Sequence, residues 1–216
     1  KYQTKGDYLI YNSKDPLVVK IAEESKAKKI PIQGKYYELN RAATEAVAKI
    51  FKVSVPEKLK FLPHRLEYVG KFRGVKFYND SLSTVPETAI EALDFLGDNV
   101  QTMILGGYDR GLNFKKLAKR LSESQVKTLI LFPTTGRRIW QDLFDFVNRT
   151  HLFGLRNRTI HFFVDNMEKA VKLAYKHTDR GKICLMSPAS PSFGIFKDYA
   201  ERGEAFKKFV KKYGAG

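Results

Sequence analysis

Residues 75–87, which read VKFYNDSLSTVPE, predict a short strand, a polar turn and a helix in direct succession. The first four residues form the apolar strand, and Pro86 followed by an acidic residue is typical of the first turn of a helix. Ser83 or Thr84 is expected to cap that helix. Open α/β sheets hold anionic ligands in a polar loop of this kind, although an ordinary capped turn has the same pattern.

Two more polar loops follow apolar strands later in the chain, GGYDRG at 106–111 and SPASPS at 187–192. Because the carboxyl ends of parallel strands share one edge of a sheet, we expect all three loops to open on the same side. Arg110 is suited to bidentate binding of a carboxylate or phosphate, and Ser190 and Ser192 are suited to donating hydrogen bonds to a carboxylate. A surface arginine and two capping serines are the alternative interpretation.

From residue 64 onward, apolar strands alternate with amphipathic helices. The expected strands span 66–72, 75–78, 102–105, 126–132, 160–164 and 183–186. One expected helix begins at residue 86, and four more span 113–122, 137–147, 167–177 and 195–210. This alternation predicts βαβ crossovers and a mostly parallel sheet that is covered on both faces. The predicted fold class is therefore α/β, a Rossmann-like doubly wound sheet.

Residues 1–63 have a different pattern. They contain two expected helices, at 16–25 and 38–51, a strand at 8–12, and a short apolar run at 30–32 that fits an edge strand. These elements are too few to form a stable hydrophobic core of their own. We therefore expect two domains, a tail of a larger α/β domain at 1–63 and the Rossmann-like domain at 64–216.

The chain is strongly basic, with a formal net charge of +16 and a pI near 9.8. Nucleic acid is one partner that such a charge attracts. The lysines are nevertheless spread over most of the expected helices, and the sequence has no zinc-ligand spacing and no aromatic motif of an RNA-recognition sheet. A solvated surface that attracts anionic small molecules is the favoured interpretation, and nucleic acid is not the expected partner.

Cysteine content and hydropathy indicate the compartment. Cys184, the single cysteine, lies in the apolar run 183–186 and is expected to be a buried thiol. No disulfide framework is possible, which is typical of a reducing, cytoplasmic environment. No apolar run approaches the ~18 residues of a membrane span. The four histidines form no cluster, so no metal site and no catalytic residue is predicted from them.

Five short motifs occur together in one order along the chain. They are His64-Arg65-Leu66-Glu67, Asn79-Asp80-Ser81 with Thr84, Gly106-Gly107 with Asp109-Arg110-Gly111, Ser187-Pro188-Ala189 with Ser192, and Phe196 with Glu201-Arg202-Gly203 and Phe206. Each motif alone is weak, but their order and spacing are specific, and with them the chain resembles the Mur ligase family. The resemblance covers essentially the whole chain and is strongest to the ligases that add glutamate to UDP-N-acetylmuramoyl-L-alanine.

The resemblance implies an ATP-dependent amide ligase of bacterial peptidoglycan precursor synthesis, in which the amine of glutamate attacks an acyl phosphate. Residues 1–63 then correspond to the end of a central ATPase domain, and 64–216 to the domain that binds the amino acid. The resemblance places three residues at the ATP, namely Asn40, Arg65 and Asp80. It places six at the incoming glutamate or the product, namely Ser81, Thr84, Arg110, Ser192, Phe193 and Tyr199.

The chain also departs from the family pattern. Leu82 and Val85 stand where the family usually has lysine and asparagine, and Arg110 stands where many relatives have lysine. The loss of the first lysine leaves open which amino acid, or which stereoisomer, is added.

Two phosphate-binding elements of the family are missing from the sequence. It contains no G-x-x-G-K-[ST] phosphate loop and no segment with the modified lysine that helps to hold magnesium. We therefore expect ATP and Mg²⁺ to be held mainly by upstream residues. We also expect this chain to be an inactive fragment when it is alone. A stand-alone Rossmann-like nucleotide- or anion-binding module, or a basic nucleic-acid-binding protein, are the competing interpretations.

Overall fold

The computed structural model describes residues 2–34, 37–56, 62–150 and 159–215. The chain divides into two compact units, Lys1–Lys60 and Phe61–Gly216, which are described separately. Within the described residues, no helix has both the length and the apolar character needed to cross a membrane.

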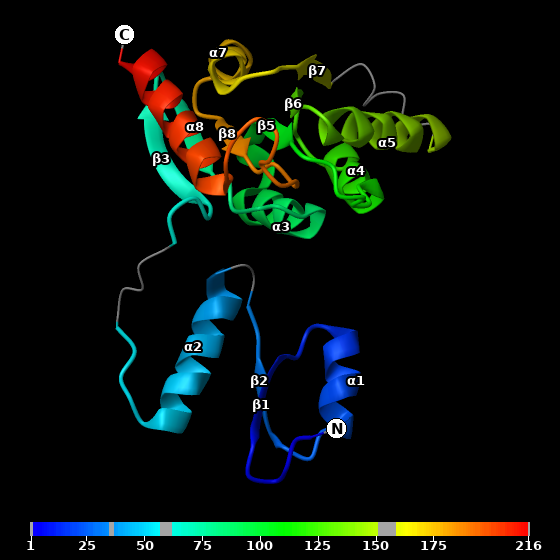
Figure 1. The fold of residues 1–216 in the computed structure, drawn as a ribbon, viewed down its shortest axis with the longest axis vertical. Coiled ribbons are helices and arrows are strands. Elements are labelled where there is room, and N and C mark those ends of the chain that lie inside the picture. The colour runs from blue at the N-terminus through cyan, green and yellow to red at the C-terminus, as the bar shows by residue number, and fades with distance from the viewer. Residues whose placement is uncertain (1, 35–36, 57–61, 151–158, 216) are drawn as a thin grey trace. The chain divides into compact units, whose positions relative to one another are not determined.

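The first unit is a parallel pair of strands with two helices (Figure 1). Its elements are β1 (Tyr8–Asn12), α1 (Pro16–Glu24), β2 (Lys28–Ile32) and α2 (Tyr37–Phe51). The short apolar run expected as an edge strand is the end of β2, which pairs with β1 so that Ile10 lies opposite Ile30. Asp15 caps α1, since its carboxylate accepts hydrogen bonds from the amides of Leu17 and Val18. Among the described residues of this unit, the buried apolar side chains are all alanines, so its core is thin.

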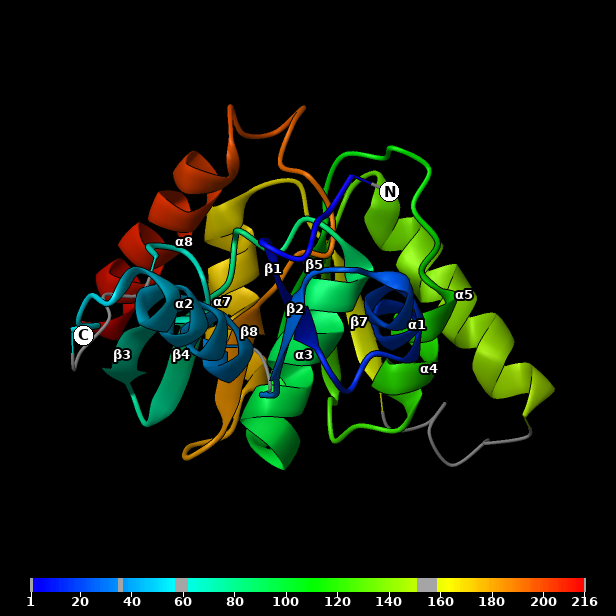
Figure 2. The ribbon, with the colours of Figure 1, turned by 90° about the horizontal axis from the view of Figure 1, so that it is seen from below.

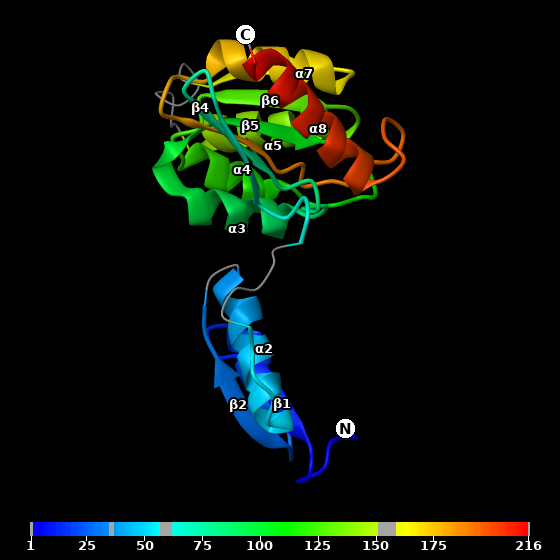
Figure 3. The ribbon, with the colours of Figure 1, turned by 90° about the vertical axis from the view of Figure 1, so that its left-hand side faces the viewer.

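The second unit contains a six-stranded sheet in the order β3-β4-β8-β5-β6-β7 (Figures 1 and 3). Its strands are β3 (Glu67–Phe72), β4 (Val75–Asn79), β5 (Val100–Gly106), β6 (Thr128–Phe132), β7 (Ile160–Phe163) and β8 (Ile183–Met186). β3 and β4 form an antiparallel hairpin, and every other pairing is parallel. The predicted α/β fold with a mostly parallel sheet is confirmed.

Helices cover both faces of this sheet, as Figure 3 shows. α7 (Met167–His177) and α8 (Tyr199–Gly214) lie on one face, and α3 (Pro86–Leu96), α4 (Lys115–Ser122) and α5 (Thr135–Arg149) lie on the other, with a short 3₁₀ helix at Gly97–Asn99. The core under α7 and α8 is built on Phe77, whose ring packs 4.8 Å from that of Tyr175 and 6.2 Å from that of Phe206. Cys184 is fully buried in the same core, and burial raises the pKa of its thiol.

The start of one helix and the cap of another differ from the sequence prediction. The closing helix begins at Tyr199 rather than at residue 195, because the carboxylate of Asp198 accepts a hydrogen bond from the amide of Glu201 and so caps the helix there. The helix at Pro86 has no side-chain cap from Ser83 or Thr84. The Ser83 hydroxyl donates to the carboxylate of Asp80 instead, so this serine stabilises the loop and not the helix.

We expect Phe77→Ala to lower the free energy of unfolding of the second unit by about 3–5 kcal/mol, because the side chain is fully buried and its removal leaves a cavity. Phe163→Ala is the matched control, since that ring is 42% exposed on β7, and we expect it to cost less than half as much. Urea unfolding followed by fluorescence of the single tryptophan, Trp140, reports this unit. Equal losses in the two variants would contradict the assignment of Phe77 to the core.

Candidate functional site

Three loops meet at the carboxyl edge of the central strands β4, β8 and β5. The amide of Asp80 donates to the carbonyl of Met186 at 2.8 Å, and that of Gly106 donates to the carbonyl of Pro188 at 2.8 Å. Farther along, the amide of Tyr108 donates to the carbonyl of Pro191 at 2.9 Å. Figure 2 shows the orange loop after β8 and the green loop after β5 emerging at the same edge. The expectation that the loops open on one side is correct.

The carboxylate of Asp80 joins two of these loops to the turn before β3. Asp80 has no exposed surface. One oxygen accepts a hydrogen bond from the amide of Leu66 at 2.9 Å, and the other accepts from the hydroxyls of Ser83 and of Ser187, the latter at 2.8 Å. A buried carboxylate needs such donors to offset the loss of its hydration. Asp80 therefore fixes the loops in place.

The turn that carries Arg65 is held from both sides. His64 and Leu66 have positive φ angles of 65° and 47°, a conformation that few residues other than glycine adopt. Glu67 stabilises the turn, because its carboxylate accepts hydrogen bonds from the amide of His64 at 3.0 Å and from the side-chain amide of Asn79 at 3.1 Å. Arg65 is half-buried at the centre of this turn, next to the loop that contains Asp80.

The His64 ring is packed between β4 and α8. Its Nδ1 lies 2.9 Å from the side-chain nitrogen of Asn79, and Gly203 lies so close that a Cβ there would be 2.2 Å from the same ring nitrogen. Burial, and then the nearby charge of Lys207, lower the pKa of His64. The imidazole is accordingly neutral near pH 7, with Nδ1 as the acceptor from Asn79.

Ser81 connects the first loop to the start of α8. Its hydroxyl donates to the carbonyl of Tyr199 at 2.7 Å and accepts from Nε of Arg202 at 3.0 Å. The guanidinium of Arg202 also donates to the carbonyl of Ser81 at 2.8 Å and to the carbonyl of Ser190 at 3.0 Å. Arg202 is 1% exposed, and burial lowers its pKa to about 9.

The Gly106–Gly107 turn approaches its neighbours too closely for any side chain. Gly106 has φ of 95°, and a Cβ there would lie 2.3 Å from the carbonyl oxygen of Phe132. The amide of Gly107 donates to the hydroxyl of Thr135 at 2.9 Å, and that hydroxyl lies 2.7 Å from the hydroxyl of Ser190. The turn thus links the loop after β5 to the loop after β8 and to the start of α5.

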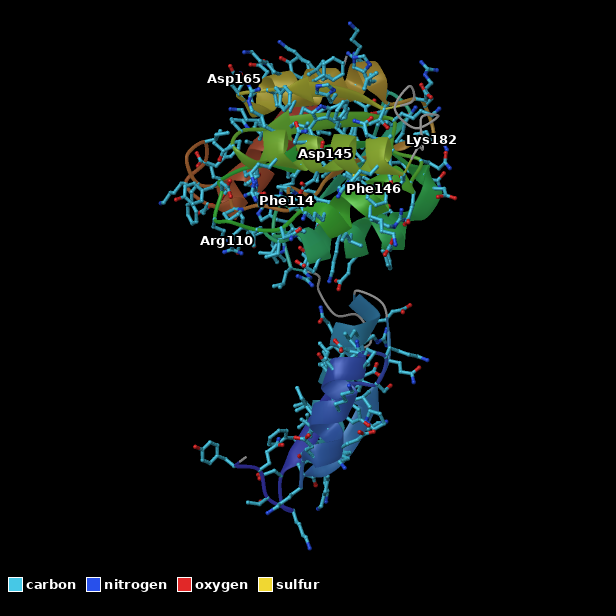
Figure 4. The ribbon with its side chains drawn as sticks, turned by 90° about the vertical axis from the view of Figure 1, so that its right-hand side faces the viewer. Arg110, Phe114, Asp145, Phe146, Asp165 and Lys182 are labelled. Carbon is cyan, nitrogen blue, oxygen red and sulfur yellow. The ribbon has the colours of Figure 1, made fainter. Side chains whose placement is uncertain are left out.

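The end of the loop after β5 presents a free cation. Asp109 pairs with Arg138 at 2.5 Å, and a hydrogen bond from the amide of Gly111, together with this arginine, holds the pKa of Asp109 below its usual range. Arg110 is exposed and makes no hydrogen bond or ion pair with any residue in the described ranges. Figure 4 shows Arg110 on the opposite side of the unit from Lys182, which precedes β8. Arg110 is therefore available to an anion that approaches this edge.

The structure brings most of the predicted site residues to one edge of the sheet, although their exposure to solvent differs. Ser81 and Ser192 are buried, Arg65 and Thr84 are half-buried, and Phe193 and Tyr199 are exposed. Phe193 packs edge-on against Tyr108, with ring centroids 6.2 Å apart. Asn40 is exposed on α2 and belongs to the other unit.

No described group of three or more histidine, cysteine, aspartate or glutamate side chains is arranged to hold a metal ion.

Sequence reasoning missed the roles of His64, Asn79 and Arg202. All three are buried polar residues that hold the loops together. Each lies inside one of the five sequence motifs, so the signal was present. An arginine in an amphipathic helix nevertheless indicates a solvent-exposed side chain until its neighbours in space are known.

Comparisons with known proteins show what the chain is similar to. No protein-family model matches the chain. The chain is 30% identical to the UDP-N-acetylmuramoylalanine–D-glutamate ligase of Caldanaerobacter subterraneus subsp. tengcongensis, over 96% of this chain and 52% of that protein. It is 38% identical to the ligase of the same name from Bdellovibrio bacteriovorus, over 80% of this chain and 33% of that protein. The chain thus spans about half the length, or less, of these relatives.

Solved structures agree on the fold. MurF from Acinetobacter baumannii superposes with a TM-score of 0.61 at 12% identity, over 96% of this chain and 52% of that chain. A folylpolyglutamate synthase from Mycobacterium tuberculosis, complexed with ADP, gives a TM-score of 0.62 at 12% identity, over 94% of this chain and 55% of that chain. At this identity the likeness supports the shared fold alone.

The lowered pKa of His64 predicts a pH dependence of stability. Because the unfolded chain binds a proton near pH 6.5 and the folded protein only at lower pH, the free energy of unfolding should fall as the pH drops below about 6.5. In His64→Asn this loss should be smaller. Asparagine suits the test because it tolerates the positive φ at this position.

The measurement is urea unfolding between pH 8 and pH 5. Burial also lowers the pKa of His161, so His161→Asn serves as the control for a histidine outside the site. If His64→Asn and the wild type lose the same stability over this range, His64 is not the titrating group.

Proposed function

Over its own length the chain belongs to the Mur ligase family, and on that premise we propose that it forms the C-terminal part of an ATP-dependent ligase. The enzyme would join glutamate to UDP-N-acetylmuramoyl-L-alanine in peptidoglycan precursor synthesis, in the bacterial cytoplasm. Residues 64–216 would bind the amino acid, and residues 1–63 would be the end of the central ATPase domain. The similarity to the D-glutamate ligases supports the choice of D-glutamate.

The observation that carries this proposal is the loop edge with its unpaired cation. Arg110 stands at the rim of three loops that are cross-linked by buried hydrogen bonds, and it has no carboxylate partner of its own in the described residues. A guanidinium in this setting is suited to a carboxylate of the incoming amino acid. Thr84, Ser192, Phe193 and Tyr199 lie on the surrounding loops and at the start of α8.

Ser81 takes a positioning role in this proposal. Its hydroxyl proton is already donated to the carbonyl of Tyr199, so it holds the start of α8 against the loop after β4. Asp80 positions the turn that carries Arg65, because its carboxylate accepts from the amide of Leu66. We propose that Arg65, Asp80 and Asn40 contribute to binding of ATP.

The contribution of this chain to the reaction is binding and orientation. ATP, when bound, supplies the phosphoryl group that activates the acceptor carboxyl. The loops then hold the amino acid so that its neutral amine faces that carboxyl, which turns an encounter in solution into a reaction between fixed groups. We propose that ATP and Mg²⁺ are held mainly by residues outside this chain, since the sequence has no phosphate loop.

The experiment that tests this proposal compares the 216-residue chain with the longer protein of which we propose it is a part. The longer protein should release phosphate from ATP only when glutamate and UDP-N-acetylmuramoyl-L-alanine are both present, and the chain alone should release none. Glutamate-dependent turnover by the chain alone would contradict the proposal that catalysis needs residues outside it. Binding of nucleotide without turnover in the longer protein would support a non-catalytic module instead.

We expect Arg110→Ala to raise the KM for glutamate in the longer protein by roughly ten- to a hundred-fold, because a hydrogen bond to a charged group contributes about 1.5–3 kcal/mol. Arg110→Lys should recover only part of this loss, because a point charge replaces a planar fork. Lys116→Ala, which removes an exposed cation from α4, is the control. An unchanged KM in both Arg110 variants would remove this residue from the site.

A further inference from the structure

Arg202 is a buried cation that pairs with no carboxylate of the described residues. The side chain is 1% exposed, and its three hydrogen-bond acceptors are the hydroxyl and carbonyl of Ser81 and the carbonyl of Ser190, all of them neutral. Within the described ranges no carboxylate forms an ion pair with it. Buried charges in proteins are normally paired, because dehydration of an isolated ion is costly.

The acidic residues around Arg202 are engaged elsewhere. Asp80 accepts from the amide of Leu66 and from two serine hydroxyls. On α8 itself, Glu201 accepts from the amide of Lys197 at 2.5 Å, and Glu204 pairs with Lys207 at 2.7 Å. None of these carboxylates neutralises the guanidinium by direct contact.

The guanidinium lies where the three loops converge. It donates to Ser81 after β4 and to Ser190 after β8, and a Cβ on Gly107 after β5 would lie 3.3 Å from its Nη1. Arg202 is therefore beneath the loop edge whose rim carries Arg110. Few solvent dipoles can screen a charge in such a place, so it acts on a nearby anion more strongly than a surface charge does.

We propose that Arg202 is a positioning residue that selects an amino acid with an acidic side chain, its charge being balanced by the side-chain carboxylate of that substrate. This inference rests on the proposed function, since glutamate is the amino acid that the site would take. The amine and the α-carboxylate share one carbon at the reacting end, so the side chain is the part that extends into the loops toward Arg202. Arg110 at the rim is then left for the α-carboxylate.

The lowered pKa of Arg202 agrees with this assignment. Burial brings the pKa to about 9, which still leaves the side chain charged at neutral pH. A carboxylate held nearby favours the charged form and relieves the cost of burial. Binding of an acidic side chain and charging of Arg202 therefore support each other.

The experiment measures how far glutamate and glutamine stabilise the 216-residue chain. Glutamine has the same shape but a neutral side chain, so the comparison isolates the side-chain carboxylate. The unfolding midpoint is followed by Trp140 fluorescence over a concentration series of each D- and L-amino acid at constant ionic strength. In the wild type, glutamate should bind at least roughly tenfold more tightly than glutamine, the scale of one charged hydrogen bond.

Three variants test the residue. Arg202→Met removes the charge and should abolish the preference for glutamate. Arg202→Lys keeps the charge without the planar fork and should retain part of the preference. Lys211→Met removes one charge from the exposed face of the same helix and should leave the preference unchanged.

The outcomes separate this inference from the proposed function. If the wild type prefers glutamate and Arg202→Met keeps that preference, the inference is wrong while the proposed function stands. If the wild type does not distinguish the two amino acids, recognition of glutamate by this chain fails and the inference fails with it. Should Arg202→Met not fold, the lysine variant decides, because loss of all preference in a folded variant that keeps the charge contradicts an electrostatic role.

Discussion

The buried carboxylate of Asp80 is the interaction on which the arrangement of the loop edge depends. With no exposed surface, it must be satisfied by donors from the protein, and its donors come from the turn before β3, the loop after β4 and the loop after β8. One side chain thereby sets the relative positions of segments that are far apart in the sequence. The turn that carries Arg65 and the loop that carries Ser81 both depend on this carboxylate.

The same edge combines a rigid base with an open rim. Beneath the loops, Arg202 and Thr135 make buried hydrogen bonds to Ser81, Gly107 and Ser190, and no side chain can be added at Gly106 without meeting the backbone of Phe132. At the rim, Tyr108, Arg110 and Phe193 are exposed. A rigid support under accessible side chains is the arrangement that ligand recognition requires, because the loops lose little conformational freedom on binding.

Much of the fold could be predicted from the sequence, because the central strands are buried on both faces and therefore appear as continuous apolar runs such as 183–186. The start of α8 was misplaced because the apolar pattern continues upstream through Phe196, while the Asp198 cap decides where the helix begins. The site was harder to read. The packing of His64 on Gly203 and the burial of Arg202 depend on contacts between the two ends of the second unit, which local periodicity does not report.

The strand order has a consequence for the continuity of the sheet. Among the described residues β8 comes last of the sheet's strands in sequence order, yet it lies at the centre of the sheet, and β4 and β5 each pair with it and not with one another. The β3-β4 hairpin and the β5-β6-β7 group precede β8 in the chain, and without β8 they have no shared ladder to join them. Without residues 183–186 their inner edges would be open, and such unpaired edges attract other chains. The continuity of the whole sheet therefore depends on one short, wholly apolar strand, which joins two groups of strands that share no other ladder.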